Sequence, residues 1–236
     1  MKQFTALPPT AHLVGALFVV LSLANIAGVA WTKPLLMPAL LLWVIDVTRT
    51  LGNRGLWFRW LVAALLFSWL GDIALMGTSQ AWFLIGIGAF ALAQISYIAM
   101  FTKVTKVTNF TVKPGISLVR AWKFTLIPYV GYWITMNVVI TAGVLQIPVV
   151  FYSALLTAMA ISALNIALRL NRPWRFVPAV GAVSFVISDS MIALQEFNGL
   201  HVVPGLVMAT YLVGQAMIAV GVICGQAPTD STSRSR

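Results

Sequence analysis

The sequence predicts an all-α protein of the membrane, a polytopic bundle of eight transmembrane helices. Hydrophobic residues make up 60% of the 236 residues and charged residues only 8%, whereas soluble domains usually carry about 25% charged residues. The mean hydropathy is +0.94, and long apolar runs recur along the chain. So few charges could not cover the surface of a soluble globule. The composition therefore excludes water-soluble enzymes, nucleic-acid-binding domains and disordered scaffolds.

Eight apolar runs are long enough, or nearly so, to cross a hydrocarbon core that needs about 20 helical residues. They predict spans at residues 11–31, 34–50, 60–77, 81–101, 122–140, 146–168, 176–195 and 202–224. The runs are continuously apolar and lack a two-residue alternation, which favours helices over barrel strands. The second span is the least regular, because Asp46 lies near its end. We expect one membrane domain over residues 1–225 and a short polar tail over 226–236.

The distribution of basic residues orients these spans. Lys and Arg concentrate in every second connection: around residues 49–59, 103–123 and 169–175, and in the tail. The other turns contain no Lys or Arg, apart from Lys33 in the first. By the positive-inside rule both termini are cytoplasmic, which requires an even number of spans. This explains the net charge of +10 without a nucleic-acid partner, and indicates a multi-pass protein of the cell (inner or plasma) membrane.

Two halves of the chain show a short similarity. Leu70-Gly71-Asp72 aligns with Ile187-Ser188-Asp189, and the stretches that end in Gln94 and Gln215 also align. One interpretation is a parallel 4+4 internal repeat, with spans 1–4 and 5–8 related by an axis along the membrane normal. The other is chance, since hydrophobic segments align readily.

Two of the five acidic residues lie inside predicted spans and have no basic neighbour in sequence. Asp46 is three residues before Arg49, which predicts an interfacial ion pair. Glu196 lies at an outer helix end and Asp230 in the tail. Asp72 and Asp189 remain.

Asp72 and Asp189 are expected at one depth in the membrane. They follow the basic residues Arg59 and Arg175 by thirteen and fourteen positions, about 20 Å along a helix. A charge at that depth costs at least ~2.5–3.5 kcal/mol. Repulsion between two facing carboxylates favours one acid and one ionised partner, the pair that general acid–base catalysis needs. The alternative is a structural role, in which each aspartate only hydrogen-bonds across helices.

Other intramembrane polar residues are weaker candidates for ligand contacts. Tyr152, Tyr211, Gln215 and Gln94 would either support a site or form interhelical hydrogen bonds. Lys33, the one basic residue expected on the outer side, would either anchor its helix at the interface or bind an anionic headgroup. With two histidines and one cysteine, neither a metal site nor another cofactor is predicted.

Taken in order, several short segments resemble the YhhN family of integral-membrane proteins, which includes the eukaryotic transmembrane lysoplasmalogenases. The resemblance covers nearly the whole chain. It is carried by Thr32-Lys33-Pro34-Leu35 with Pro38, Leu70-Gly71-Asp72, Gly86…Phe90…Gln94…Tyr97, Pro148…Tyr152, Ser188-Asp189-Ser190 and Tyr211…Gln215.

The resemblance implies a membrane-embedded hydrolase that cleaves the vinyl ether bond of a lysophospholipid, giving a fatty aldehyde and a glycerophospho-headgroup. It implies Asp72 and Asp189 as the catalytic pair, with Lys33, Ser188, Tyr152, Tyr211, Gln215 and Gln94 in binding or supporting roles. Gln94 stands where many relatives have His, so the resemblance implies no proton relay there. The expected partners are a lysophospholipid or other amphiphilic lipid and the membrane lipids; no metal or cofactor is implied.

Two other classes of function fit the same residues. A proton-coupled transporter could use the intramembrane aspartates, although its site would normally lie at the bilayer midplane. In a lipid-binding membrane protein without catalysis, the aspartates would be structural.

Overall fold

The computed structural model describes residues 7–52, 54–107, 118–169 and 174–226. Within these ranges the chain forms α-helices and two 3-10 turns, and no strand, which confirms the predicted all-α class. The helices are α1 (Pro9–Ile26), α2 (Lys33–Thr50), α3 (Leu56–Ala74), α4 (Gln80–Val107), α5 (Leu118–Val139), α6 (Gln146–Arg169), α7 (Val177–Asn198) and α8 (Leu206–Gln226). Each coincides with one predicted span. The polar tail over 227–236 lies outside the described residues.

Seven of these helices are long and apolar enough to cross a membrane. In α5 only Leu126–Val139 forms a described apolar stretch, so its crossing remains a prediction from the sequence. Large apolar side chains cover the outside of the bundle, including Leu13, Val20, Ile127 and Val138, each more than 60% exposed. Such a surface suits contact with lipid and would be unfavourable in water.

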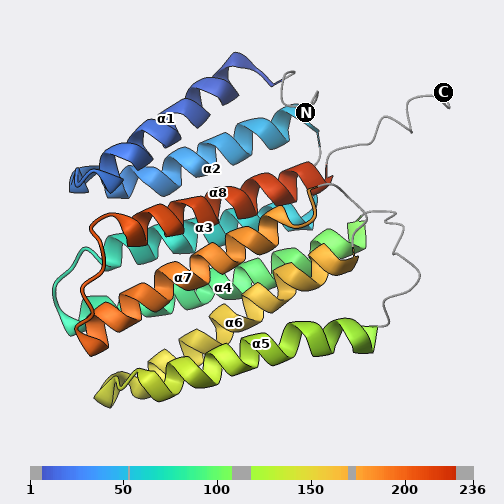
Figure 1. Cartoon of the computed structure of the whole chain (residues 1–236). Helices are drawn as coiled ribbons and strands as arrows, with labels where there is room; N and C mark the ends of the chain where they lie inside the picture. Colours follow the sequence, from blue (N-terminus) through green and yellow to red (C-terminus); the bar gives the residue numbers. More distant parts are fainter. Residues whose placement is uncertain (1–6, 53, 108–117, 170–173, 227–236) are drawn as a thin grey trace.

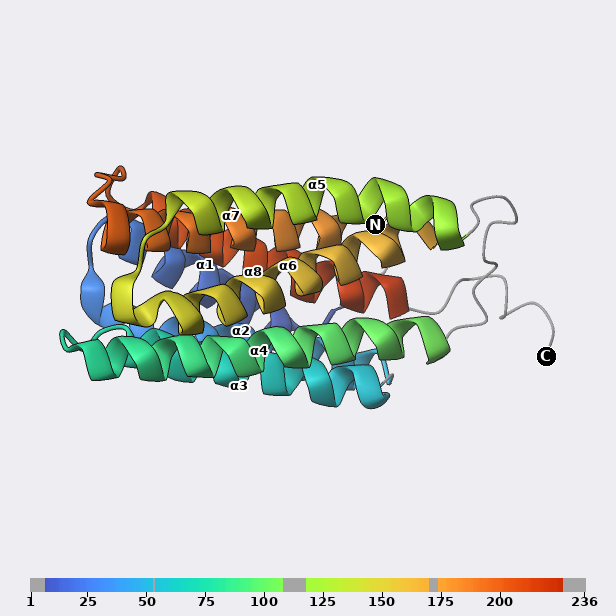
Figure 2. The same ribbon diagram turned by 90° about the horizontal axis from the view of Figure 1, so that it is seen from below.

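The helices run side by side along one direction (Figures 1 and 2). α1 and α2 form one edge, α5 and α6 the opposite edge, and α3, α4, α7 and α8 lie between them. The start of α1 and the end of α8 lie at the same end of the bundle. Which end faces the cytoplasm remains a prediction, as does the parallel repeat.

Glycines allow two helix pairs in the centre to approach closely. A Cβ added to Gly71 of α3 would lie 2.6 Å from the Phe90 ring of α4. In the second pair, a Cβ on Gly181 of α7 would lie 2.8 Å from the carbonyl oxygen of Gly214 of α8, and one on Gly214 would lie 2.9 Å from that of Gly181. In a membrane the hydrophobic effect does not drive helices together, and small residues promote association because they let the helices pack closely. Each of these two pairs, α3–α4 and α7–α8, carries one of the candidate aspartates.

Long side chains fill the seam between these two pairs. Phe90 of α4 packs edge-to-face on Phe185 of α7 and on Tyr211 of α8, with ring centroids 6.4 and 6.1 Å away. Phe185 and Tyr211 are 5.3 Å apart in the same geometry, which favours contact between the positive edge of one ring and the negative face of the other. Two members of this aromatic cluster, Phe90 and Tyr211, also line the cavity described below.

One expected contact at the far end of the bundle is not formed. Asp46 of α2 accepts a 2.6 Å hydrogen bond from the Thr10 hydroxyl of α1, and the described side chains show no ion pair between Asp46 and Arg49. The predicted ion pair was therefore wrong, and the described partner of the Asp46 carboxylate is the Thr10 hydroxyl of α1. Asp46 lies outside the site described below.

Candidate functional site

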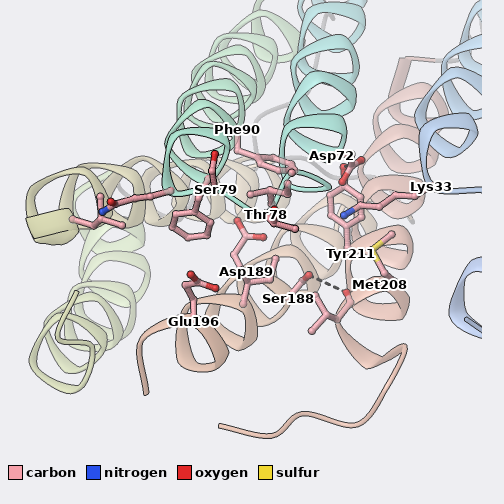
Figure 3. Close-up of a pocket in the computed structure, with 17 residues that line it drawn as sticks. Lys33, Asp72, Thr78, Ser79, Phe90, Ser188, Asp189, Glu196, Met208 and Tyr211 are labelled. Atoms are coloured by element: carbon pink, nitrogen blue, oxygen red, sulfur yellow. Dashed lines mark hydrogen bonds between the residues drawn. The ribbon is translucent and has the colours of Figure 1, made fainter. Parts of the chain in front are cut away.

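A cavity of about 760 Å³ opens at one end of the central helices. Side chains of α2, α3, α4, α7 and α8 and of the connection after α3 surround it (Figure 3). Its lining includes both candidate aspartates, one lysine and a third carboxylate. The residues are Lys33, Asp72, Leu75, Gly77, Thr78, Ser79, Gln80, Phe83, Phe90, Leu145, Ser188, Asp189, Ile192, Glu196, Val207, Met208 and Tyr211.

Asp72 lies in the last turn of α3 and is only 3% exposed. The Tyr211 hydroxyl of α8 donates a 2.8 Å hydrogen bond to its carboxylate. The ammonium group of Lys33 lies next to it and within electrostatic reach (Figure 3). A buried carboxylate is stable in such a place only with donors and a nearby positive charge, and this site supplies both.

The turn before α2 explains how Lys33 reaches Asp72. The Thr32 hydroxyl donates to the Val29 carbonyl at 2.7 Å and accepts a 3.1 Å hydrogen bond from the Asn25 amide. Pro34 follows in the first turn of α2, where its missing N–H costs nothing. The Trp69 indole of α3 donates to the Pro34 carbonyl at 2.8 Å. This bond ties the start of α2 to α3 three residues before Asp72.

Asp189 lies in the middle of α7 and accepts a hydrogen bond from the Tyr152 hydroxyl of α6. The buried Gln94 amide of α4 in turn donates to the Tyr152 oxygen at 3.5 Å. Asp189 also borders a second, apolar pocket of about 60 Å³ between α4, α6 and α7, lined by Phe83, Ile87, Val149, Phe197 and their neighbours. It is therefore the one of the two aspartates that borders both the large cavity and the apolar pocket.

A second polar group lies behind Asp72. Gln215 of α8 is fully buried, accepts a hydrogen bond from the Tyr97 hydroxyl and donates a 3.0 Å bond to Ser68. These bonds join α3, α4 and α8 one turn away from the Tyr211–Asp72 contact. Buried polar groups that are fully paired rigidify a core, so this cluster holds Tyr211 in position.

The structure brings all eight predicted site residues to this region, in different positions. Five of them line the large cavity: Lys33, Asp72, Ser188, Asp189 and Tyr211. Tyr152 lines the apolar pocket, while Gln94 and Gln215 lie behind the aspartates. The Ser188 hydroxyl donates to the Val207 carbonyl of α8 at 3.0 Å, so it joins two helices and holds neither aspartate.

Reasoning from the sequence missed one charged member of the cavity. Glu196 is exposed and lines the cavity two helical turns beyond Asp189. A spacing of seven residues places two side chains on one face of a helix. That spacing was the available signal, and it was overlooked because Glu196 was assigned to a helix end. Within the described part of the chain, no group of three His, Cys, Asp or Glu residues could hold a metal ion.

Comparison with known proteins places the chain in a family. The model of the YhhN family matches residues 29–222. The chain belongs to the YhhN family. It is 32% identical over 204 residues to proteins named lysoplasmalogenase from Mycobacterium bovis and Mycobacterium tuberculosis. These alignments cover 82% of this chain and 73% of each relative. None of the solved structures matches it.

Proposed function

We propose that this YhhN protein is a membrane-embedded hydrolase that cleaves the vinyl ether bond of a lysophospholipid. The observation that carries the proposal is the pair Asp72 and Asp189, which line one cavity from two different helix pairs. Each carboxylate is oriented by its own tyrosine. The relatives named lysoplasmalogenase support the substrate class.

Hydrolysis of a vinyl ether requires an acid and an activated water. The acid protonates the alkene carbon one position from the ether-bearing carbon, and the resulting oxocarbenium ion is attacked by water. The hemiacetal so formed collapses to a fatty aldehyde and the glycerol hydroxyl, and the proton that water loses replaces the one that the acid gave. The use of one group as acid and another as base resembles the roles of the two carboxylates in inverting glycosidases.

The two carboxylates lie in different surroundings, and on this basis we assign proton donation to one and activation of water to the other. Asp189 borders both the large cavity and the apolar pocket of about 60 Å³, so it is adjacent to the alkene when the first carbons of the hydrocarbon chain enter that pocket. We assign proton donation to Asp189. Asp72 lies at the polar side, beside Lys33, and we assign it the activation of water and the stabilisation of the cation. Lys33 would pair with the substrate phosphate.

Aldehyde release from lysoplasmalogen by purified protein tests this proposal. Asp72→Asn and Asp189→Asn keep the side-chain shape and remove the ionisable group, and each is expected to lower the rate at least ~10²-fold. Asp46→Asn is the matched control, because Asp46 is bound by Thr10 away from the cavity, and its rate should stay within about twofold. Aldehyde release that survives in both site variants, with monodisperse protein, would contradict the proposal.

A further inference from the structure

The apolar pocket beside Asp189 is too small for the whole hydrocarbon chain of a membrane lipid. Its volume is about 60 Å³, whereas an apolar cavity of about 150 Å³ holds a single benzene molecule. Each leaflet supplies half of a hydrocarbon core roughly 30 Å thick, so one lipid chain is about 15 Å long. Only the first carbons of the chain fit into the pocket, and the rest of the chain needs another place.

The pocket leads towards a second cluster of apolar side chains, which we call the outer cluster. It consists of Ile140, Ala142 and Val149 with Ile87, Met136, Leu145, Ala193, Leu194 and Phe197. Four of these residues also line the pocket: Ile87, Val149, Ala193 and Phe197. α6 contacts both α4 and α7 but diverges from them towards the cavity end of the bundle (Figure 1). The pocket thus connects the cavity with apolar side chains from four helices.

Two aromatic rings meet across this connection. Phe83 of α4 and Phe197 of α7 both line the pocket, and their rings are in edge-to-face contact with centroids 5.9 Å apart. Phe83 also lines the large cavity, whereas Phe197 belongs to the outer cluster. Both side chains are only partly buried, and neither is part of the main buried core. Either ring can therefore turn aside without disturbing that core.

The surface next to the outer cluster suits lipid. Val144 and Ile147, on either side of Leu145, are exposed, and so is Phe151 one turn further along α6. Exposed apolar side chains of this size are favourable in contact with hydrocarbon and unfavourable in water. The cationic side of the cavity lies elsewhere, because Lys33 is beside Asp72 (Figure 3).

We propose that Phe83 and Phe197 form a lateral exit for the hydrocarbon chain of the substrate. The chain passes from Asp189 between the two rings, lies along the outer cluster and ends in the surrounding lipid. Phe83 and Phe197 are then specificity-determining residues for the chain. For turnover this inference rests on the proposed function; for binding it stands alone.

Photolabelling of the wild-type protein tests the route without any substitution. The probe is a saturated 1-O-alkyl lysophospholipid with a diazirine midway along the chain, which lacks the alkene to be protonated. Labelled peptides are identified by mass spectrometry, with and without excess unlabelled lipid as competitor. We expect competed labelling within residues 83–87, 136–149 and 193–197. Competed labelling confined to α2 and α8 would overturn the exit, as would labelling that the competitor does not reduce.

A reversible crosslink between the two positions tests the exit in turnover. In a Cys224→Ser background, Phe83→Cys with Phe197→Cys is joined by a short bis-methanethiosulfonate reagent. Aldehyde release is compared for a long 1-alkenyl chain and for one short enough to end inside the pocket. One methylene too many in a closed pocket costs about 10- to 200-fold, so the crosslink should lower the long-chain rate at least tenfold and spare the short chain. Reduction should restore the long-chain rate, and Leu13→Cys with Leu17→Cys on the exposed face of α1 is the control.

The two experiments separate the possible failures. A long-chain rate unchanged by a crosslink verified by mass would overturn the exit, and so would an equal loss for both chain lengths. Competed labelling of the outer cluster, without aldehyde release from either 1-alkenyl lipid, would contradict the proposed function and support the chain-binding route.

Discussion

At the scale of single residues, the candidate site depends on hydroxyl groups that come from distant parts of the chain. Tyr211 is 139 positions from Asp72, and Tyr152 is 37 positions from Asp189. Each phenol donates to the carboxylate that it contacts and fixes its orientation. Hydrogen bonds to charged groups contribute about 1.5–3 kcal/mol, so these tyrosines hold the geometry on which acid–base chemistry would depend.

Tyr211→Phe removes only the hydroxyl that donates to Asp72 and keeps the ring in the aromatic cluster. We expect kcat for aldehyde release to fall roughly 10- to 100-fold, from the loss of a hydrogen bond of that strength, with little change in thermal stability. Tyr129→Phe is the control, because Tyr129 of α5 has no hydrogen-bond partner among the described residues. An unchanged kcat in Tyr211→Phe would contradict the positioning role.

The sequence identified the two aspartates but not their partners. Asp72 and Asp189 could be recognised because a carboxylate inside a membrane span is costly and rare. No local sequence pattern shows which tyrosine donates a hydrogen bond to each aspartate. In the aligned halves, the counterpart of Tyr211 is Phe90, which has no hydroxyl, and the donor to Asp189 comes instead from α6. Such pairings depend on which helices lie side by side, and one sequence does not contain that information.

At the scale of helices, close packing within α3–α4 and α7–α8 keeps the elements that carry the aspartates rigid. Gly181 and Gly214 face each other's backbone at distances where no side-chain atom fits without displacement. The helix positions were predictable from hydropathy. The pairing of helices through glycine was not, because the short Gly-containing segments give no register by themselves.

Gly214→Ala should destabilise the protein, because the new methyl group would lie 2.9 Å from the Gly181 carbonyl oxygen and 3.0 Å from the Phe185 backbone nitrogen. Overpacking of this kind typically costs 1–3 kcal/mol, so we expect a clear fall in Tm in detergent. Gly88→Ala in α4 is the control: a Cβ there meets nothing within 4 Å, and alanine favours the helix. Equal Tm values for the two variants would refute the packing argument.

At the scale of the whole molecule, the bundle has the large cavity at one end, and the basic residue Arg49, in the last turn of α2, lies at the other. Thr50 and Asp46 at the end of α2 lie at the end opposite to the turn before Lys33. The positive-inside rule therefore places the cavity opening on the outer side of the membrane.

Labelling with a membrane-impermeant maleimide checks this orientation. In a Cys224→Ser background, His201→Cys places a thiol in the exposed turn between α7 and α8, and Thr50→Cys places one at the exposed end of α2. We expect labelling of the first variant in intact cells, and of the second only after permeabilisation. The reverse pattern would show that the cavity opens to the cytoplasm.

The seam between α3–α4 and α7–α8 has a consequence for how this protein would lose activity. Within each pair, glycines allow close contact, of backbone with backbone in α7–α8 and of backbone with the Phe90 ring in α3–α4. Between the two pairs, the contacts are made by ring edges and an amide group, from Phe90, Phe185, Tyr211, Tyr97 and Gln215. Because one aspartate belongs to each pair, a small separation of the pairs would pull the two carboxylates apart while every helix stayed intact. Under the proposed mechanism, a solubilised sample in which the two pairs had separated would be fully helical and yet inactive.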